Sequence, residues 1–518
     1  MDAFDLIIEH GTVMDGSGSP GFPADVGIRN GRIAAVAPLT AAQAARRIDA
    51  TGHVVAPGFI DAHQHGEIGV LVNPSVEQSI HQGITTVLVG LCGVSAAPRI
   101  EPCMADHRYY LPELRELGLD WQSFGDYLAL VDGRPSVNVA SMVGYDNLRI
   151  TVMGFRAGAP TPVELAEIQA QARAAMDAGA IGISHGAGPA SLWSNHEEVT
   201  AVARTIGQQG GLYISHVRPP AADDVLSPYK EAIRLGREAE VALQITHFKT
   251  FNESLYGRAD DMLALVDEAR SRGQDVTIAS YPYTGGGGGL RVPSWAEEGG
   301  PSEILRRLRD PELRKRIAQE LNQNWTWETH IAAARSPKNK WCEGLKIAEI
   351  ARKTGMTAGE VICVLIEDEN MAVGAVHEHA GEDDVRRIMT YPTHMVGSDS
   401  QHFGPFRHPR CYGTYPRYLG HYVRELGLMS LEDCVRRMTS FPAQRLGLVD
   451  RGLLRVGMAA DVTVFAPDTV IDRATLEQPQ QYPDGIPYVL INGQVVIDQG
   501  VYTGVKPGRA LRRGVATQ

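Results

Sequence analysis

Two histidines, His63 and His65, are the first residues in the chain whose types and spacing could do metal chemistry. They lie in PGFIDAHQHGE, just after an apolar run, 54–60, that predicts a short buried strand and is followed by Asp61. Residues two positions apart in an extended segment point to the same side, so both imidazoles can reach one metal ion. The pattern predicts a metal site at the end of a strand.

Further residues with ligand-type side chains follow later apolar runs in the same way: Cys92, His216, His247 and Asp399. Each has an ordinary explanation when taken singly, because a buried free cysteine behaves as a small hydrophobe and a lone histidine can be a structural hydrogen-bonding residue. Asp399, in SDS, could also be a helix N-cap. Coincidence is a poor explanation for the position of all these residues at strand ends on one face.

Zinc is the metal that this set of donors suits, because it binds imidazole and thiolate and also accepts carboxylate. A catalytic zinc lowers the pKa of its bound water to about 7, and the resulting hydroxide can attack a carbonyl carbon. A carboxylate beside it can take the proton and pass it to a leaving nitrogen. Asp399 is our candidate for this general base.

These residues need a scaffold that brings strand ends together, and the middle of the chain predicts one. Strand-like runs alternate with helical stretches such as 162–178 and 228–239, which is typical of an α/β fold with a parallel sheet. Eight runs predict a TIM-like (β/α)8 barrel, in which the carboxyl ends of the strands share one face. They cover residues 54–60, 84–89, 137–143, 180–184, 212–215, 242–246, 276–280 and 394–398. A ninth candidate, 372–376, leaves the order of the late strands open.

The two ends of the chain resemble each other, because both consist of short β runs with an Asn-Gly hairpin, at Asn30-Gly31 and Asn492-Gly493. We therefore expect residues 1–55 and 450–518 to fold together as one small β domain beside a barrel of residues 56–449. The tail after about residue 506 is expected to be loosely ordered.

An insertion is expected at about 285–345. It begins with five glycines, 285–289, which lack the Lys-Ser/Thr of a phosphate-binding loop and predict a flexible hinge. A helical segment at 302–320 and a tryptophan-rich patch at 324–327 follow. This segment could cover the site as a lid.

Composition narrows the class of protein. The net charge of −12 argues against a nucleic-acid or anionic-membrane partner. The six cysteines contain no CxxC pair, so neither a disulfide framework nor a zinc ribbon is indicated, and a cytoplasmic location is expected. The first residues lack the pattern of a signal peptide, and no apolar run is long enough to span a bilayer. We expect a small-molecule substrate, and the chain could form a homo-oligomer.

A set of motifs extends over nearly the full length: PGFIDAHQHGE, GLCGVSAAP, YISHVR, QITHFK, SYPYT, VGSDS, HPRCYGTYPRYLG, DRGLLRVGMAADVTVF and INGQVV. Together they resemble the N-acyl-D-amino-acid deacylase (D-aminoacylase) family of the amidohydrolase superfamily. The resemblance implies a TIM-like barrel with a small β-sandwich built from both termini, zinc, and hydrolysis of an amide bond.

The resemblance also implies roles for individual residues. Cys92, His216 and His247 match the ligands of a tight zinc, His63 and His65 could hold a second, weaker metal together with Cys92, and Asp399 matches the general base. Lys249, Tyr281 and Tyr283 match pocket residues. Lys249 comes two residues after His247, so it should point to the same face and could meet a substrate carboxylate.

The chain departs from the family pattern beside the expected site. It has His63-Gln64-His65-Gly66-Glu67 in place of HTHDD, Ser184-His185-Gly186 in place of STG, and His377-Glu378-His379 near a stretch that is MSE-like in the family. His185 could be a substrate-contacting donor or a packed polar residue. For His377 and His379 we favour a substrate-contact or structural role over a second metal site. These changes put the specificity for N-acyl-D-amino acids in question.

The function predicted is zinc-dependent hydrolysis of the linear amide bond of an N-acyl-D-amino acid or a related N-acyl compound. A cyclic amidase or lactonase of the same superfamily is the alternative, and a non-catalytic binding barrel is a remote one. A dinucleotide-binding oxidoreductase is poorly supported, because no GxGxxG follows the first strand.

Overall fold

The computed structural model describes residues 3–186, 188–218, 224, 226–250, 255–324, 328–378, 380–401 and 403–517. Its centre consists of parallel strands arranged in two sheets, with orders β26-β11-β10-β8 and β12-β13-β14-β15-β16-β20. The strands are β8 (Phe59–Asp61), β10 (Ile84–Val89), β11 (Asn138–Ser141), β12 (Val143–Gly144), β13 (Gly182–His185), β14 (Leu212–Ser215), β15 (Ala242–Ile245), β16 (Val276–Ser280), β20 (His394–Val396) and β26 (Ala510–Leu511).

Backbone hydrogen bonds join the two parallel sheets at both ends. Ile181 donates to the carbonyl of Ser141 over 2.9 Å, and Ala62 donates to the carbonyl of Val396 over 3.2 Å. All six residues of β10 are buried, as a strand covered on both faces requires. The carboxyl ends of neighbouring strands therefore lie side by side.

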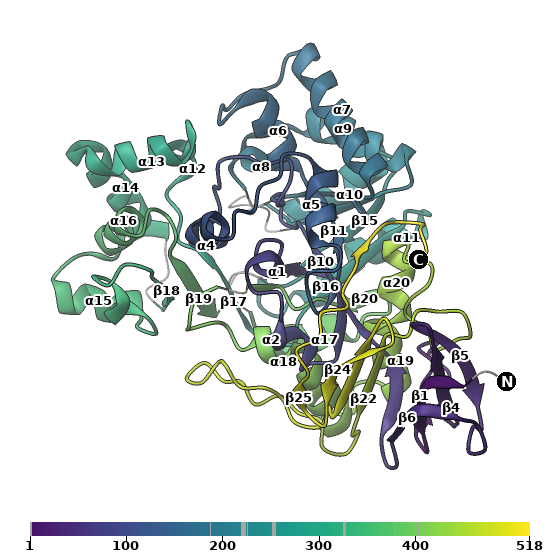
Figure 1. The fold of residues 1–518 in the computed structure, drawn as a ribbon. Helices are drawn as coiled ribbons and strands as arrows, with labels where there is room; N and C mark the ends of the chain where they lie inside the picture. Colours follow the sequence, from purple (N-terminus) through teal and green to yellow (C-terminus); the bar gives the residue numbers. More distant parts are fainter. Residues whose placement is uncertain are drawn as a thin grey trace.

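Helices alternate with these strands and surround them (Figure 1). The expected helix at 162–178 is confirmed as α7, which begins after a Thr161–Glu164 capping box and ends at Gly179 in the left-handed conformation. The principal helices are α5 (Phe124–Val131), α6 (Tyr145–Met153), α7 (Pro162–Ala178), α9 (His196–Gln208), α10 (Ser227–Glu238), α11 (Ala259–Ser271), α17 (Glu382–Met389), α18 (Arg410–Arg417), α19 (Leu431–Met438) and α20 (Ser440–Leu446).

The first predicted strand, 54–60, is two strands in the structure. β7 (Val54–Pro57) joins the terminal sheet through β2 and β22, whereas β8 pairs with β10. The chain changes sheet at Gly58, where a Cβ atom would lie 2.2 Å from Thr85 Oγ1. One apolar run could not reveal this break, because both halves are equally apolar and equally buried.

Strands from both ends of the chain share a seven-stranded sheet of order β25-β24-β23-β22-β7-β2-β3, and purple and yellow strands lie side by side in Figure 1. A four-stranded sheet of order β5-β4-β1-β6 packs with it, and the two ends share one hydrophobic core. Both expected hairpins are confirmed, at β4–β5 and β23–β24. The strands are β1 (Phe4–Glu9), β2 (Thr12–Val13), β3 (Phe22–Pro23), β4 (Asp25–Arg29), β5 (Arg32–Ala37), β6 (Ala44–Asp49), β22 (Val462–Phe465), β23 (Tyr488–Ile491), β24 (Gln494–Asp498) and β25 (Val501–Tyr502).

The expectation of a loosely ordered tail is wrong. β26 (Ala510–Leu511) pairs in parallel with β11, and Leu511 is buried. The tail is ordered because it covers the free edge of β11 and adds an apolar side chain to the core beneath it.

The hinge predicted at the five glycines is also wrong. They form β17 (Gly285–Gly289), which pairs antiparallel with β19 (Gly374–Glu378), and β19 also pairs with β18 (His330–Ala333). A Cβ atom at Gly285 would lie 2.5 Å from Glu378 Oε1, and one at Gly289 would lie 2.7 Å from Ala105 Cβ. Glycine is used here for close packing within a strand. The ninth strand candidate is this β19, which lies outside the parallel sheets.

The segment between β17 and β19 has a hydrophobic core of its own and projects from the rest of the molecule (Figure 1). The expected helix at 302–320 is two helices, because Asp310 and Pro311 interrupt it. The tryptophans of 325–327 lie outside the described residues. The helices are α12 (Ser294–Glu297), α13 (Gly300–Arg309), α14 (Pro311–Asn324), α15 (Ile347–Thr354) and α16 (Ala358–Asp368).

Candidate metal centre

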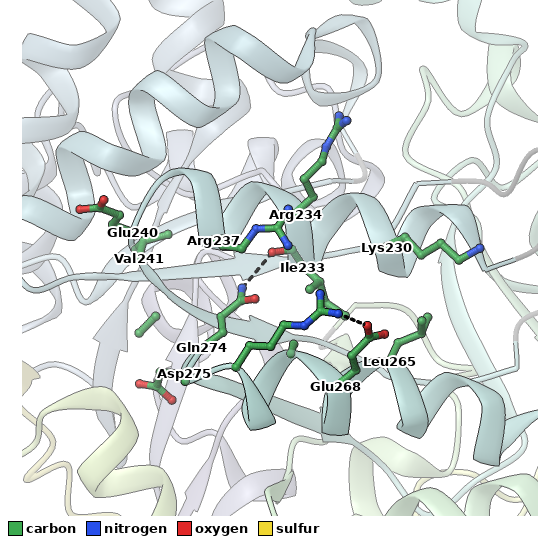
Figure 2. Close-up of a pocket in the computed structure, with 15 residues that line it drawn as sticks. Lys230, Ile233, Arg234, Arg237, Glu240, Val241, Leu265, Glu268, Gln274 and Asp275 are labelled. Atoms are coloured by element: carbon green, nitrogen blue, oxygen red, sulfur yellow. Dashed lines mark hydrogen bonds and ion pairs between the residues drawn. The ribbon is translucent and has the colours of Figure 1, made fainter.

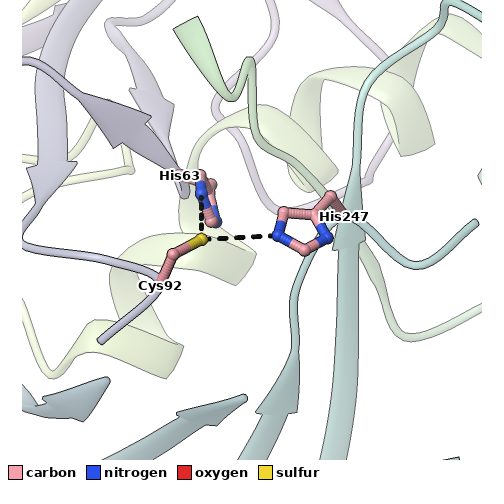
Figure 3. A group of neighbouring side chains, drawn as sticks. All are labelled: His63, Cys92 and His247. Atoms are coloured by element: carbon pink, nitrogen blue, oxygen red, sulfur yellow. Dashed lines mark hydrogen bonds between the residues drawn. The ribbon is translucent and has the colours of Figure 1, made fainter. Parts of the chain in front are cut away.

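The Cys92 thiol lies between two imidazoles at the centre of a buried cluster (Figure 3). Its Sγ is 3.6 Å from His63 Nε2 and 3.4 Å from His247 Nε2. The three side chains are 1–4% exposed, and their donor atoms lie within 4.8 Å of one another. A thiolate and two imidazoles converging in this way are donors of the kind that zinc prefers.

A second group shares His63 with the first. His63 Nε2 and His65 Nε2 are 3.3 Å apart, and Asp399 Oδ1 lies 3.4 Å and 3.3 Å from these two atoms. Together the two groups could hold one or two metal ions.

These residues come from different strands and meet because each follows the carboxyl end of its strand. His63 lies two residues after β8, Cys92 three after β10, His247 two after β15, and Asp399 three after β20. Cys92, His247 and Asp399 also have positive φ angles of 53°, 34° and 50°. Such backbone conformations are strained for residues other than glycine and cluster at functional sites.

His216 follows β14 directly and lies beside the cluster without belonging to either of these two groups of donors. Its ring centroid is 4.3 Å from that of His247. Its Nδ1 atom is buried and has no hydrogen-bond partner among the described residues. A buried ring nitrogen left in this way beside a thiolate and imidazoles fits a metal ligand, because unpaired buried polar atoms are costly.

The charges around the cluster favour the ionised forms of its acids. Burial alone raises the pKa of a thiol, but the charges of the neighbouring histidines hold the pKa of Cys92 well below its ordinary value. Burial likewise opposes ionisation of Asp399, but the Arg410 guanidinium and hydrogen bonds from His63 hold its pKa well below the ordinary value. A thiolate and a carboxylate are the states that bind a cation or accept a proton.

Arg410 was not predicted as a site residue, although it lies in the quoted motif HPRCYG. Its Nη1 is 2.8 Å from Asp399 Oδ2, it is 1% exposed, and its guanidinium lies 4.5 Å from the Tyr281 ring centroid. Only the fold brings α18 beside the loop after β20, so spacing in the sequence carries no signal for this pair.

Two further residues, which sequence reasoning missed as site components, hold the candidate ligands in place. Thr246 Oγ1 hydrogen-bonds His63 Nδ1, which leaves Nε2 of that ring facing Cys92. Asp61, fully buried, accepts from the backbone N–H groups of His63 at 3.2 Å and Ser398 at 2.8 Å, and from the Ser398 hydroxyl at 2.5 Å. Asp61 therefore ties the His63 loop to the Asp399 loop.

The predicted substrate residues Lys249 and Tyr281 lie together beside Arg410. Lys249 Nζ is 3.3 Å from the Tyr281 ring centroid and donates to the carbonyl of Tyr283. Burial and the charge of Arg410 hold the pKa of Lys249 well below its ordinary value. The Tyr283 hydroxyl donates to Asp472 at 3.1 Å, so it is already engaged by the C-terminal part of the chain.

The other predicted histidines have less direct links to the cluster. Both ring nitrogens of His185 are engaged, by Ser194 Oγ at 3.1 Å and the Tyr213 hydroxyl at 3.2 Å. These hydrogen bonds favour the interpretation of His185 as a packed polar residue. His377 lies on β19, and burial together with the charge of Arg410 lowers its pKa to about 4. His379 lies outside the described residues.

A groove of about 480 Å³ between α10 and α11 lies at the other end of β15 (Figure 2). Ala242, the first residue of β15, lines it, whereas His247 follows the last residue of that strand. Charged side chains of both signs surround it, including Arg237, Glu268 and Asp275. It contains none of the predicted site residues.

The chain is similar to known amidohydrolases over nearly its full length. The amidohydrolase family matches residues 46–497. The chain is 36% identical over 522 residues to the D-aminoacylase of Alcaligenes xylosoxydans xylosoxydans. The matched region covers 99% of this chain and 98% of that relative. No helix among the described residues is long and apolar enough to cross a membrane.

Solved structures are similar along the whole chain. N-acyl-D-glutamate deacylase from Bordetella bronchiseptica, in complex with zinc and a phosphonate mimic of the tetrahedral intermediate, matches with a TM-score of 0.85 and 35% identity over 99% of this chain and 100% of that one. A D-aminoacylase studied for one-metal activation and second-metal attenuation at its binuclear centre matches with a TM-score of 0.83 and 36% identity, over 98% and 100% of the two chains. The chain belongs to the amidohydrolase family and, within it, to the D-aminoacylase family of N-acyl-D-amino-acid deacylases.

Proposed function

We propose that this protein is a zinc-dependent hydrolase that cleaves the linear amide bond of an N-acyl-D-amino acid. The observation that carries the proposal is the buried cluster in which the Cys92 thiol meets His63 and His247 with Asp399 beside them. Its donor chemistry fits zinc, and full-length relatives with zinc or a binuclear centre in their structures are deacylases of this kind.

Cys92, His216 and His247 are proposed to hold the tight zinc, and His63 and His65, with Cys92 shared, a weaker second metal. The orphaned Nδ1 of His216 supports a role as a ligand, and the lowered pKa of Cys92 supports a thiolate in the shared position. Zinc bound here would lower the pKa of a water molecule and polarise the acyl carbonyl.

Asp399 is the residue proposed to handle the proton. Its Oδ1 faces His63 and His65, whereas its Oδ2 is paired with Arg410. The low pKa keeps the carboxylate ionised and ready to accept a proton from water. The same group would then pass that proton to the leaving nitrogen.

Lys249 and Tyr281 are proposed to bind the substrate carboxylate. Lys249 Nζ and the Arg410 guanidinium both lie over the Tyr281 ring, and Arg410 pairs with the Asp399 oxygen that does not face the histidines. A carboxylate placed there would restore the charge of Lys249, because an anion raises the pKa of a buried amine. Tyr283, His377 and His185 are proposed to shape the pocket behind these groups.

We propose that the parallel strands close into one eight-stranded TIM-like barrel of residues 56–449, and that residues 1–55 and 450–518 form a β-sandwich beside it. The backbone bonds between the two parallel sheets and the core shared by the two termini support this arrangement. The segment that begins at β17 is proposed to act as a lid. A cytoplasmic location, a homo-oligomer and the lack of a nucleic-acid partner remain predictions.

A panel of N-acyl-D-amino acids, their L-enantiomers, hydantoins and lactones tests the proposal, with chelated and zinc-reloaded protein compared. We expect release of a carboxylic acid and a free D-amino acid that depends on zinc. Ring opening gives a single product, so product analysis separates the two kinds of activity. Zinc-dependent ring opening without deacylation of any D-conjugate would contradict the proposal.

A further inference from the structure

A second cluster of metal-binding side chains lies apart from the Cys92 cluster. Glu67, Asp106 and His107 each offer a donor atom, and these three atoms lie within 4.8 Å of one another. Glu67 follows β9 (Gln64–His65), and the other two residues belong to α3 (Ala105–Tyr109). The side chains are all buried, with exposed fractions of 1%, 9% and 7%.

The carboxylate of Glu67 is only half satisfied. Its Oε1 hydrogen-bonds His107 Nε2 at 2.9 Å, whereas its Oε2 is buried and finds no hydrogen-bond partner among the described residues. A buried carboxylate oxygen left unpaired costs about 1–3 kcal/mol or more. An unpaired oxygen of this kind, on one of the three gathered side chains, can take a cation as its partner.

The charge of the cluster points to the same conclusion. Glu67 and Asp106 are two buried acids, and no lysine or arginine in the described part of the chain forms an ion pair with either of them. His107, even when protonated, offsets only one negative charge.

We propose that Glu67, Asp106 and His107 bind a divalent transition-metal cation at a site separate from the Cys92 cluster. The chemistry of the donors favours Zn²⁺. Zinc contacts imidazole nitrogen and carboxylate oxygen at about 2.0–2.2 Å, so donors this close can converge on one ion with small side-chain movements. The ion takes the place of the hydrogen between His107 Nε2 and Glu67.

The contacts of the neighbouring residues show what such an ion connects. The Tyr127 hydroxyl donates to the carbonyl of Glu67 at 2.9 Å, two residues from His65. On α3, Arg108 donates to the carbonyl of Asn370 at 2.7 Å and to its side chain at 3.0 Å. The ion therefore clamps the loop that carries His65 to a helix that is attached to the inserted segment.

Crystals of the full chain grown with zinc test the location of the ion directly. Anomalous scattering recorded above and below the zinc absorption edge should give a peak among Glu67, Asp106 and His107, in addition to density at the Cys92 cluster. Filled density at Cys92 with none at this second position would overturn the proposal.

Zinc counting gives an independent readout. Chelated protein is dialysed to equilibrium with Zn²⁺ alone, and bound zinc is measured for the wild type, His107→Ala and the shape-conserving Asp106→Asn. We expect each variant to hold one equivalent less than the wild type. His81→Ala is the matched control, because His81 is similarly buried at 9% but lies outside both clusters and stacks on Tyr482. Equal zinc content in the wild type and folded Asp106→Asn would refute the site.

Discussion

Arg410 is the residue through which the chemistry of Asp399 can be tested most quantitatively. Its guanidinium is buried, and its Nη1 lies 2.8 Å from Asp399 Oδ2. Arg410→Met keeps a long apolar side chain and removes the charge. Two unit charges whose centres are about 4 Å apart interact by about 4 kcal/mol at an effective dielectric constant of about 20.

This energy corresponds to a pKa shift of about 3 units for Asp399, at about 1.4 kcal/mol per unit. Zinc at the proposed site would also favour the carboxylate, so we expect an observed shift of about 1–3 units. The sign follows from the role of the group. In the proposed mechanism Asp399 acts as the carboxylate. Its pKa is depressed in the native protein, so we expect activity to be lost as the pH falls through that pKa.

The pH profile of kcat/KM is the assay, because it reports the essential groups of the free enzyme. In Arg410→Met the acid limb should move to higher pH. In Arg410→Lys the acid limb should lie between those of the wild type and Arg410→Met. Arg437→Met is the control, since Arg437 is also buried and ion-paired, with Asp433. An unchanged acid limb in folded, zinc-loaded Arg410→Met would refute the reasoning.

Substitutions at four further positions test the proposed ligands and the residues that support them. Thr246→Val removes the hydrogen bond that orients His63 and should weaken the second metal by about 10–100-fold in equilibrium dialysis, whereas unchanged affinity would show that Thr246 does not orient the ring. His216→Ala should cost more zinc affinity than His63→Ala, and the reverse order would overturn the division into tight and weak sites. Asp61→Ala leaves the buried N–H groups of His63 and Ser398 unpaired and should cost roughly 2–6 kcal/mol of unfolding free energy, with Asp61→Asn much milder; equal stability in denaturant titrations of the two variants would contradict this account.

Local pattern predicted much of the scaffold. The strand at 84–89, the strand at 212–215 and the helix at 162–178 have the expected bounds, because each is marked by a strong apolar run or by capping residues. The errors arose where local pattern and tertiary contacts disagree. The five glycines lack every local signal of a strand, and only the atoms packed against β17 explain them.

Prediction of the site was limited in the same way, because local pattern does not reveal tertiary contacts. The six residues predicted to hold metal or act as the base follow strand ends, and the structure gathers five of them into two overlapping groups with His216 alongside. Arg410 and Thr246 could not be deduced from spacing, because they are separated in the chain from the groups they contact. Glu67 was visible only as a departure from the family pattern, and its partners on α3 carried no signal of their own.

The central claim is that Asp399 transfers the proton beside a zinc centre formed around Cys92. Turnover of an N-acyl-D-amino acid by Asp399→Asn, measured with zinc content and circular dichroism on the same preparation, tests it most directly. Loss of one general base is typically worth about 10²–10⁴-fold in rate. We predict a fall in kcat of at least about that size, with fold and tight zinc retained. Wild-type turnover by the folded, zinc-loaded variant would contradict the account.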